Sequence, residues 1–192
     1  MAQAPSKRRR LDLDAVVDEA AKLCDEVGIE KLSISTLADR LGIRPPSLYN
    51  HIKSLDDLYS QLSRRGMREF TLAVEQAVTA DSGERPAMAL AKAPREFARR
   101  HPTLFVCATR HFHLPPEEKK QVGWHLMEVT ENAIARSDAD RRQAEVAQYF
   151  MRCLIYGFLF LEANDAMLPA RPEELDQLYE DVIAMAETGL PH

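Results

Sequence analysis

The sequence predicts an all-α protein with an N-terminal three-helix helix-turn-helix domain and a larger C-terminal helical domain. Apolar residues recur at intervals of three and four along most of the 192-residue chain. Alternating runs of β-branched residues, the usual sign of half-buried strands, are nearly absent. The length fits one small domain joined to a larger one. We expect a basic arm over residues 1–10, a helix-turn-helix head over 11–53, a connecting helix over 54–79 and a body over 80–192.

The first helix of the head is expected over residues 13–27. Asp12 and Asp14 stand near its start, where acidic residues suit a helix N-terminus, and Gly28 follows its end. Its apolar stripe consists of Leu13, Val16, Val17, Ala20, Leu23, Cys24 and Val27. The stripe is wide enough to pack on the two helices that follow, and we expect Cys24 in that core.

Residues 33–52 have the pattern of two short helices joined by a tight turn, which is a helix-turn-helix motif. Ala38 is small enough for a second helix to cross closely. Gly42 follows the last apolar residue of the first helix, where a left-handed conformation ends the helix at little steric cost. Pro45 and Pro46 suit the opening of a helix but would break its interior. We therefore expect the second helix to start near Pro46.

The second helix of the motif has one inward face and one free face. Leu48 and Ile52 are four residues apart, so they share the inward face. The side chains left to point elsewhere are Ser47, Asn50 and His51, with Tyr49 near the boundary. Helix-turn-helix motifs place their second helix in the major groove of DNA, so these side chains are candidates for contacting bases and phosphates.

A long helix is expected to connect the head to the body. Ser54 and Asp57 resemble a capping box at its start, and no proline follows until Pro86. A single helix shared by two domains can transmit movement, because rotating its far end displaces the motif at its near end.

The body ends in two helices with extensive apolar surface. The segment 144–161 is apolar nearly all round, which indicates burial on more than one face. The last helix has its apolar positions at Leu175, Leu178, Val182, Met185 and Ala186. One body needs less apolar surface than this, so we predict a homodimer in which the two helices of each chain form a four-helix bundle. The alternative is a monomer with both helices in its own core, because periodicity does not show which partner covers a face.

Charge is unevenly spread along the chain. The formal net charge is −5, with +2 on residues 1–68 and −7 on residues 69–192. The run from Lys7 to Arg10 lies directly before the head. A mildly basic head on an acidic body suits a protein that meets phosphate with one end only. Taken alone, the basic run is equally well explained as a disordered, solubilising terminus, and the neighbouring motif favours contact with DNA.

The sequence favours a cytoplasmic protein without a membrane partner. Cys24, Cys107 and Cys153 are widely spaced and include no C-x-x-C pair, so neither a zinc site nor a disulfide framework is indicated. The longest apolar run, residues 153–161, is far shorter than the ~20 residues of a membrane span. The N-terminal residues lack the apolar region of a signal peptide.

No catalytic motif, metal site or cofactor is predicted. The chain has no nucleophile elbow, no glycine-rich phosphate loop and no recognisable carboxylate pair, so an enzyme is disfavoured. His111 and His113 are two residues apart and face different sides of a helix, which argues against shared metal ligation. The body has residues of the types that line a small-molecule pocket: Phe97, Phe105, Trp124, His125, Met127, Tyr149, Phe150 and Cys153. Plain core packing is the alternative for each of them.

The run GIEKLSISTLADRLGIRPPSLYNHIKSLDDLYSQL, residues 28–62, resembles the DNA-binding domain of tetracycline-repressor-like (TetR) transcriptional regulators. The body resembles the same family through EFARRHPTLF and YGFLFLEA. The resemblance implies an all-α homodimer whose two heads bind a palindromic operator in double-stranded DNA. It also implies a cavity for a small-molecule effector in each body.

The family motif supplies expected roles for individual residues of the head. Tyr49 and His51 fall on a Tyr-x-His pair that contacts phosphate and packs beside the reading helix. Together with the arm, the expected DNA-contacting set is Arg8, Arg9, Arg10, Ser35, Thr36, Arg44, Pro45, Pro46, Ser47, Tyr49, Asn50, His51 and Lys53. One position departs from the pattern, because Leu55 stands where many relatives have a phosphate-binding lysine. We expect Lys53 to take over that contact.

The predicted function is a DNA-binding repressor that a small-molecule effector releases from its operator. Arg44, Ser47 and Asn50 would read bases, with ~1–3 kcal/mol of discrimination for each good bidentate pair. The other residues of the set would hold phosphates, and two heads roughly 34 Å apart would reach adjacent major grooves. The alternative is a dimeric small-molecule sensor or adaptor that does not bind DNA.

Overall fold

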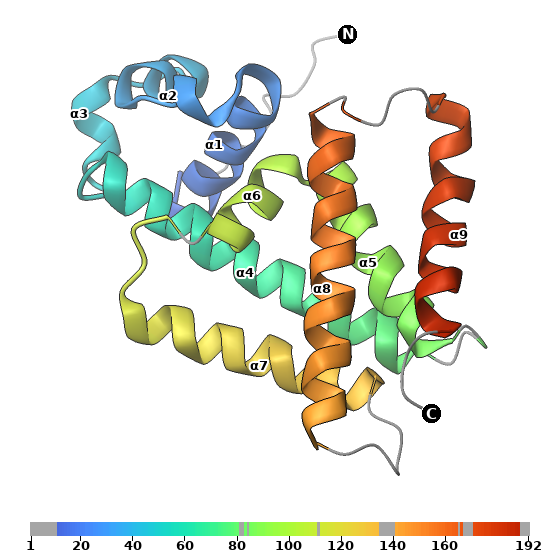
Figure 1. Cartoon of the computed structure of the whole chain (residues 1–192). Coiled ribbons are helices and arrows are strands. Elements are labelled where there is room, and N and C mark those ends of the chain that lie inside the picture. The colour runs from blue at the N-terminus through green and yellow to red at the C-terminus, as the bar shows by residue number, and fades with distance from the viewer. Residues whose placement is uncertain are drawn as a thin grey trace, which may run out of the picture.

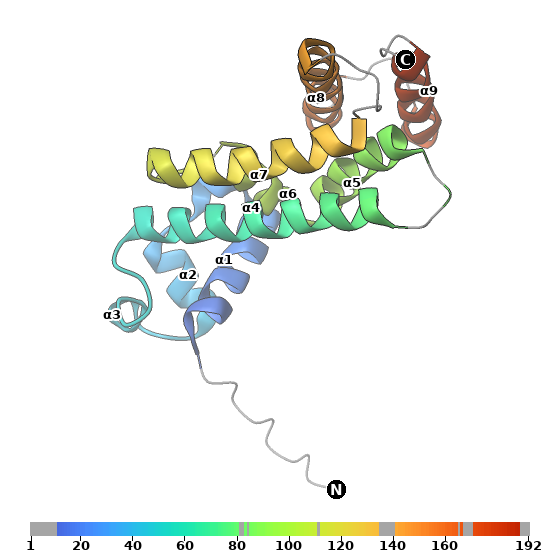
Figure 2. The ribbon, with the colours of Figure 1, turned by 90° about the horizontal axis from the view of Figure 1, so that it is seen from below.

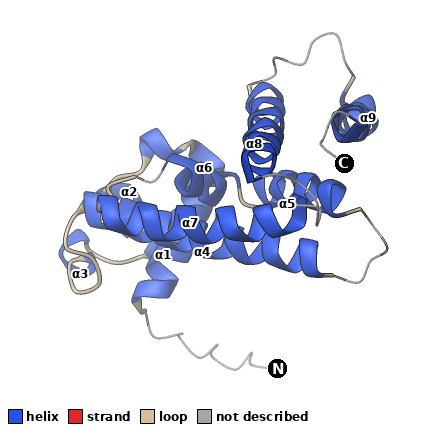
Figure 3. Ribbon diagram, turned by 60° about the horizontal axis from the view of Figure 1, so that its bottom comes forward, coloured by secondary structure: helices blue, strands red, loops and turns tan. Residues whose placement is uncertain are grey.

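The computed structural model of the protein describes residues 11–80, 83, 85–110, 112–134, 141–164, 166 and 171–188. Regular structure in these ranges is entirely helical, which confirms the predicted all-α fold (Figures 1 and 3). The predicted basic arm, with Arg8, Arg9 and Arg10, lies outside the described residues.

The helices divide into a head, a connecting helix and a body. The head contains α1 (Leu13–Val27), the 3₁₀ turn η1 (Ile29–Lys31), α2 (Ile34–Leu41) and α3 (Pro45–Leu48). The connecting helix is α4 (Leu55–Thr79). The body contains α5 (Pro86–Arg100), α6 (Pro102–Arg110), α7 (Pro116–Ile134), α8 (Arg141–Ala163), η2 (Pro172–Glu174) and α9 (Leu175–Thr188).

The head packs its helices around a small apolar core and ties them with charged pairs at its surface. Asp12 caps α1 by accepting a hydrogen bond from the N–H of Ala15 at 2.9 Å. Cys24 is buried in this core, as predicted. Arg40 of α2 makes a bidentate pair with Glu26 of α1, with distances of 2.7 and 2.6 Å. These contacts fix α2 on α1 and leave α3 at the outer end of the head (Figure 1).

Helix α4 runs without a break from the head to the far end of the body (Figures 1 and 2). Ser54 caps it by accepting from the N–H of Asp57 at 3.0 Å, while the Asp57 carboxylate accepts from the N–H of Lys53 at 2.8 Å. Within α4, a Cβ atom built on Gly66 would lie 2.3 Å from the carbonyl oxygen of Leu104 in α6. Glycine therefore permits the close crossing of α4 and α6.

The body surrounds the far half of α4. Helices α4 and α7 lie side by side, and α8 and α9 both pack on α5 (Figure 2). Helix α5 continues through Pro94. The Phe70 ring of α4 meets Phe97 and Phe105 edge-on, with centroid distances of 5.5 and 5.7 Å. These rings join the core of the head to the core of the body.

A buried charged cluster holds α5, α8 and α9 together. The Arg95 side chain makes two hydrogen bonds of 2.9 Å to Glu162 of α8 and a 3.0 Å ion pair with Asp176 of α9. Its guanidinium also lies 4.6 Å from the ring centroid of Tyr179. Tyr179 in turn donates a 2.6 Å hydrogen bond to the carbonyl of Ala91. Helix α9 is thus fixed on its own chain by both charge and packing.

Helix α8 is more apolar than its burial requires. Over Arg142–Ala163 its mean hydropathy reaches 1.2, so by length and composition alone it could cross a membrane, a test that core helices of soluble proteins also pass. Only 39% of the 18-residue stretch with this hydropathy is buried. The remaining apolar side chains of α8 lie on the surface of the single chain.

Candidate nucleic-acid interface and body cavity

The turn between α2 and α3 has the geometry that its residues predict. Ser33 accepts a hydrogen bond from the N–H of Thr36 at 3.1 Å, and Thr36 accepts one from the N–H of Ser33 at 3.0 Å. This reciprocal capping box starts α2. Gly42 ends α2 in the left-handed conformation, with φ of 65°, and the N–H of Ile43 then donates to the carbonyl of Ala38.

The second helix of the motif is shorter than expected. It begins at Pro45, one residue before the predicted start, and ends at Leu48. The chain then turns through residues 49–51, with the N–H of His51 donating to the carbonyl of Leu48 at 2.8 Å. The start of α4 explains the short length, because Asp57 holds the N–H of Lys53 only five residues after Leu48. Ile52 is nevertheless buried, as the spacing predicts.

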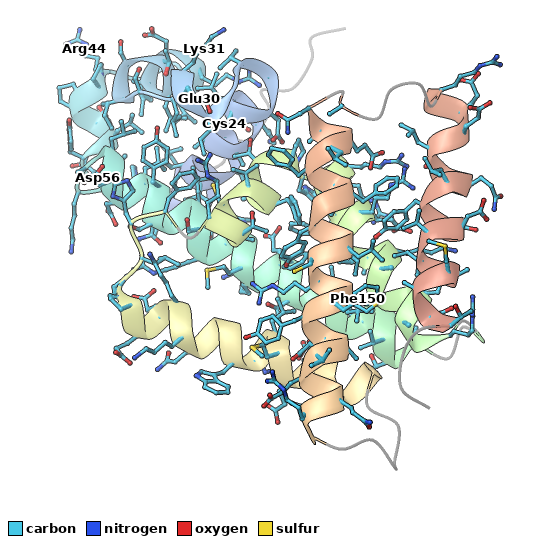
Figure 4. The ribbon with its side chains drawn as sticks, viewed as in Figure 1. Cys24, Glu30, Lys31, Arg44, Asp56 and Phe150 are labelled. Carbon is cyan, nitrogen blue, oxygen red and sulfur yellow. The ribbon has the colours of Figure 1, made fainter. Side chains whose placement is uncertain are left out.

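The predicted DNA-contacting residues within the described part of the chain gather at the outer end of the head. Figure 4 shows Arg44 at this end, remote from α8 and α9. Ser35, Thr36, Arg44, Pro45, Pro46, Tyr49, Asn50 and Lys53 are exposed, and Ser47 and His51 are half-buried. Tyr49 leaves 55% of its surface exposed. The group forms one surface that we call the reader surface.

One member of this set has its polar group already occupied. The Thr36 hydroxyl caps Ser33 and lies 3.1 Å from the Ser33 carbonyl and 3.4 Å from the Lys31 carbonyl. Its first task is therefore to shape the start of α2. Ser35, the exposed neighbour, has no such commitment among the described residues.

The reader surface carries positive charge that the head does not neutralise. Lys22 and Arg40 are paired with glutamates of α1. Arg44 and Lys53 have no carboxylate within ion-pair distance in the described part of the chain. The same is true of Lys31, which the sequence reasoning did not select and which Figure 4 shows on the same outer edge as Arg44. Unpaired exposed cations beside a free aromatic residue suit contact with phosphates.

The head contacts α6 and α4. The Asp25 carboxylate of α1 accepts a 2.8 Å hydrogen bond from the backbone N–H of Thr103, in the first turn of α6. Arg65 of α4 pairs with Asp18 of α1 at 2.8 Å. Tyr59 of α4 donates to the carbonyl of Ile29 at 3.3 Å. The head is therefore attached to both α4 and α6.

Helices α4 to α8 enclose a cavity of about 80 Å³ in the body. Most of its lining is apolar, with Phe70, Val74, Leu90 and Ile155 among the lining residues. A volume of this size has room for several water molecules or a compact apolar group. A cavity between helices with a few polar groups is a common form of small-molecule site.

Two of the eight predicted pocket residues, Met127 and Tyr149, line this cavity. The other six do not. Phe97 and Phe105 pack in the core, where their rings contact Phe70. Trp124 is 71% exposed. The Nε2 atom of His125 lies 2.7 Å from a carboxylate oxygen of Glu75. Phe150 is exposed on α8 (Figure 4), and Cys153 is exposed on the same helix. Residue type marked these positions as pocket-like, but the rotation of α7 and α8 turns them away from the interior.

The polar residues of the cavity were missed by the sequence reasoning. They are Thr71, Thr109, Thr130, Gln148, Arg152 and Tyr156. One signal was available, because Gln148, Arg152 and Tyr156 are spaced by four and therefore share one face of α8.

These polar groups differ in whether they are already satisfied. Thr109 donates to the carbonyl of Phe105, and Gln148 donates to the carbonyl of Met127 at 2.7 Å. The Thr71 hydroxyl is buried and has no hydrogen-bond partner. Burial raises the pKa of Tyr156 above its usual value, so its phenol stays neutral. The Thr71 hydroxyl and the Arg152 charge are the groups that a bound molecule can still use.

The structure offers little for covalent or metal chemistry. Burial raises the pKa of the Cys24 thiol to about 11 and that of the Cys107 thiol to about 12, which keeps both protonated and unreactive at neutral pH. In the ranges that the structure describes, no three His, Cys, Asp or Glu side chains are placed to hold a metal ion.

Models of known protein families match the chain in two places. The model for bacterial regulatory proteins of the tetR family matches residues 16–62, which contain the helix-turn-helix and the start of α4. The model for the tetracyclin repressor-like C-terminal domain matches residues 87–186, which contain the cavity helices of the body and α9.

Whole-length relatives give the same result. The HTH-type transcriptional regulator YobS of Bacillus subtilis (strain 168) is 31% identical over 163 residues, which cover 84% of this chain and 84% of the relative. The HTH-type transcriptional regulator Rv0681 of Mycobacterium tuberculosis is 30% identical over 186 residues, which cover 94% of this chain and 82% of the relative. A solved structure from Rhodococcus sp. RHA1, of unknown function, shares the fold with a TM-score of 0.75 at 20% identity, covering 98% of this chain and 100% of that one.

Proposed function

Because the chain belongs to the TetR family of helix-turn-helix transcriptional regulators, we propose that it is a cytoplasmic repressor that a small-molecule effector releases from a palindromic operator. Regulators of this family bind DNA operators and small-molecule effectors and work as dimers, and they are generally not enzymes. We propose no enzymatic activity, cofactor or metal for this chain.

The observation that carries the proposal is the reader surface. Its exposed aromatic and polar side chains lie on and around the short helix α3, and its cations Arg44 and Lys53 have no carboxylate partner in the described part of the chain. An acidic protein with uncompensated positive charge at one end is suited to bind a polyanion with that end only.

We assign base reading and phosphate contact to different members of this surface. Arg44 suits guanine, Asn50 suits adenine and Ser47 suits either base. The residues assigned to phosphates are Ser35, Tyr49, His51 and Lys53, with Arg8, Arg9 and Arg10 of the arm as a further prediction. Pro45 and Pro46 fix the direction of α3, and Thr36 acts through the cap of α2.

Dimerisation through α8 and α9 is supported by their exposed apolar stripes. On α8 the exposed residues Val146, Phe150, Cys153, Gly157 and Phe160 are spaced by four, three, four and three. On α9, Leu178 and Met185 are exposed and lie one above the other, with Val182 between them. Such stripes are typical of helices that pack against a partner helix. We therefore propose that two copies bury these stripes in a four-helix bundle.

Gly157 supports the same arrangement. A Cβ atom built there would have no neighbour within 4 Å, so the single chain gives no reason for a glycine in the middle of α8. A helical glycine is less favourable than alanine by about 1 kcal/mol. At the centre of the stripe it allows two copies of α8 to approach closely.

Release from the operator follows from the path of α4. The same helix begins beside the reader surface and later contributes Met67, Phe70, Thr71 and Val74 to the cavity. A ligand that favours a shifted α4 also favours a changed spacing of the two heads. The loss of operator affinity then cannot exceed the factor by which the ligand affinities of the two shapes differ.

A gel-shift experiment with the DNA upstream of the protein's own gene tests the proposal. The wild-type protein is expected to retard this DNA, and a double variant with Tyr49→Ala and Asn50→Ala is expected to lose the retardation. The matched control is Arg100→Ala, which removes an exposed charge from the body. Circular dichroism of each variant checks that its helices are intact.

This experiment distinguishes a DNA-binding repressor from a sensor or adaptor that does not bind DNA. Unchanged binding after the double substitution would refute the assignment of the reader surface. A dimer that binds small molecules but retards no genomic DNA at any salt concentration would favour the sensor or adaptor function instead.

A further inference from the structure

Among the described residues that line the body cavity, one is charged, and this residue is basic. It is Arg152 of α8, and none of the described lining residues is Asp or Glu. The Arg152 side chain is exposed, so it stands at the mouth of the cavity and not in its interior. The lining therefore combines an apolar interior with a cation at the entrance.

The Arg152 charge is not neutralised by the part of the chain that is described. No carboxylate in those residues lies within 4 Å of its guanidinium. It lies beside Tyr156, whose ring centroid is 5.6 Å from the guanidinium carbon, and it makes a side-chain hydrogen bond with the same residue. In contrast, Arg95 and Arg99 of α5 share the carboxylates of Glu162 and Asp176. The positive charge at the cavity mouth remains available to a ligand.

The interior supplies one more unused polar group. Thr71 lines the cavity, is 6% exposed, and its hydroxyl has no hydrogen-bond partner. Buried polar groups without partners are uncommon in native proteins, because each lost hydrogen bond is unfavourable. A rotation about the Cα–Cβ bond exchanges the hydroxyl with the methyl group and presents either one to the cavity.

We propose that the effector is a compact, mostly apolar molecule with a single anionic head, of the class of a short-chain or aromatic carboxylate. The carboxylate pairs with Arg152 at the cavity mouth, and the apolar part occupies the interior. The Thr71 hydroxyl forms a hydrogen bond with a polar atom of the ligand or with a water molecule bound to it. This inference rests on the proposed function and specifies the ligand of its regulatory site.

Binding of a series with one tail and different heads tests the ligand class. Isothermal titration with the full-length protein would compare benzoate with benzyl alcohol, benzamide and benzylamine, and butanoate and hexanoate would probe the size of the apolar part. A charge-assisted pair with arginine is expected to make benzoate bind about tenfold or more tightly than benzyl alcohol. Benzylamine, which brings a like charge to Arg152, is expected to bind most weakly.

Substitutions of Arg152 test whether this residue causes the preference for a carboxylate. In Arg152→Gln, the affinity for benzoate is expected to fall to that for benzyl alcohol, while the affinity for benzyl alcohol is unchanged. Arg152→Lys is expected to restore part of the preference, because it keeps the charge and loses the bidentate geometry. The matched control is Arg142→Gln, an exposed arginine on the same helix that is not part of the cavity lining. Melting temperatures of all variants check that the fold is retained.

The outcomes separate the ligand class from the regulatory function. Three results would overturn the inference, whether or not the protein binds operator DNA. They are equal binding of the acid, the alcohol and the amine, a preference for the acid that remains in Arg152→Gln, and no saturable binding of any carboxylate. Tight, Arg152-dependent binding of benzoate supports it. If that binding then leaves operator affinity unchanged in fluorescence anisotropy, the ligand class stands and the release mechanism is wrong.

Discussion

A Cβ atom on Gly66 would lie 2.3 Å from the carbonyl oxygen of Leu104 and 3.2 Å from the backbone nitrogen of Ala108. Both neighbours are backbone atoms of α6, which cannot move aside as the end of a side chain can. The crossing of α4 and α6 at this point brings the connecting helix against the helix that also contacts the head through Asp25. The position of the head relative to the cavity therefore depends on a glycine.

Gly66→Ala is expected to destabilise the fold by roughly 1–3 kcal/mol, because overpacking at a close helix crossing forces the backbones apart. Chemical denaturation measured by circular dichroism gives the free energy of unfolding. Gly123→Ala is the control, since a Cβ on this helical glycine meets nothing within 4 Å. It is expected to gain about 0.5–1 kcal/mol from helix propensity. Equal effects of the two substitutions would contradict the close crossing.

Arg44→Ala is expected to reduce operator affinity by about 1–3 kcal/mol and to relax the preference for one base at one position of each half-site. Fluorescence anisotropy on single-base operator variants measures both effects. The Arg100→Ala control should leave both unchanged. A uniform loss over all operator variants would instead assign Arg44 to phosphate contact.

Lys53→Ala is expected to weaken binding to all DNA sequences alike. A phosphate contact contributes a slope of roughly 0.9 to the fall of log affinity with log salt concentration in double-stranded DNA. The Lys53 variant of the dimer loses two symmetric contacts, so the slope should become shallower by about 2. Lys31→Ala provides a comparison at the other exposed cation of the head, and an unaltered slope for either lysine would remove it from the interface.

Asp25→Ala is expected to destabilise the fold by about 1 kcal/mol, the usual effect of removing a side chain that caps a helix. Asp25→Asn keeps an acceptor for the N–H of Thr103 and should retain most of the stability. The alanine variant is also expected to weaken the effect of an effector on DNA binding, since it cuts one contact between α6 and the head. Comparing operator affinities with and without ligand in the two variants measures this coupling.

Thr71→Val is expected to stabilise the ligand-free protein by about 1 kcal/mol, because a buried hydroxyl without a partner is replaced by a methyl group of the same shape. Ser63 has a second buried, unpartnered hydroxyl that is not part of the cavity lining. Ser63→Ala should therefore also raise the melting temperature but leave ligand binding unchanged. If both variants bind ligand as the wild type does, the Thr71 hydroxyl has no role in the cavity.

Glu162 is expected to make stability fall in acid. Burial favours its neutral form, but hydrogen bonds from Arg95 and Arg99 outweigh this and lower its pKa below the ordinary value of 4.5. A carboxyl whose pKa is lower in the folded state contributes stability that is fully present above the unfolded pKa. That contribution is lost as the pH falls below 4.5 and through the folded pKa.

Glu162→Gln provides the test of this pH dependence. The free energy of unfolding of the variant should be lower by about 1.5–3 kcal/mol at neutral pH, the typical value for hydrogen bonds to a charged group. Its stability should also change less than that of the wild type between pH values above and below 4.5. Parallel pH profiles of the two proteins would show that the acid sensitivity arises elsewhere.

Local signals in the sequence predicted the helix-turn-helix well. The cap at Ser33, the left-handed Gly42 and the cap at Ser54 all depend on contacts within four residues, so the residue types alone determine them. The length of α3 was harder to predict, because Asp57 reaches back to Lys53 and leaves room for a single short helix.

The cavity could not be predicted in the same way. Its lining comes from five helices, and whether a side chain faces inward depends on how each helix is rotated against its neighbours. Trp124 has the residue type of a pocket wall and is exposed, while Thr71 and Arg152 have ordinary surface types and line the cavity. The close approach at Gly66 is also invisible in the sequence, because a helical glycine has the same local pattern with or without a neighbour.

The charged cluster around Arg95 has a consequence for how subunits exchange. Helix α9 is attached to its own chain by Asp176 and by the Tyr179 hydrogen bond to Ala91, so it does not need a partner to stay in place. In the proposed dimer, two copies can therefore part along the α8 and α9 stripes and exchange subunits without either chain unfolding. Mixing two differently labelled preparations should yield hybrid dimers at a rate set by dissociation of the bundle, and hybrids with one defective head would reveal whether a single head holds the operator.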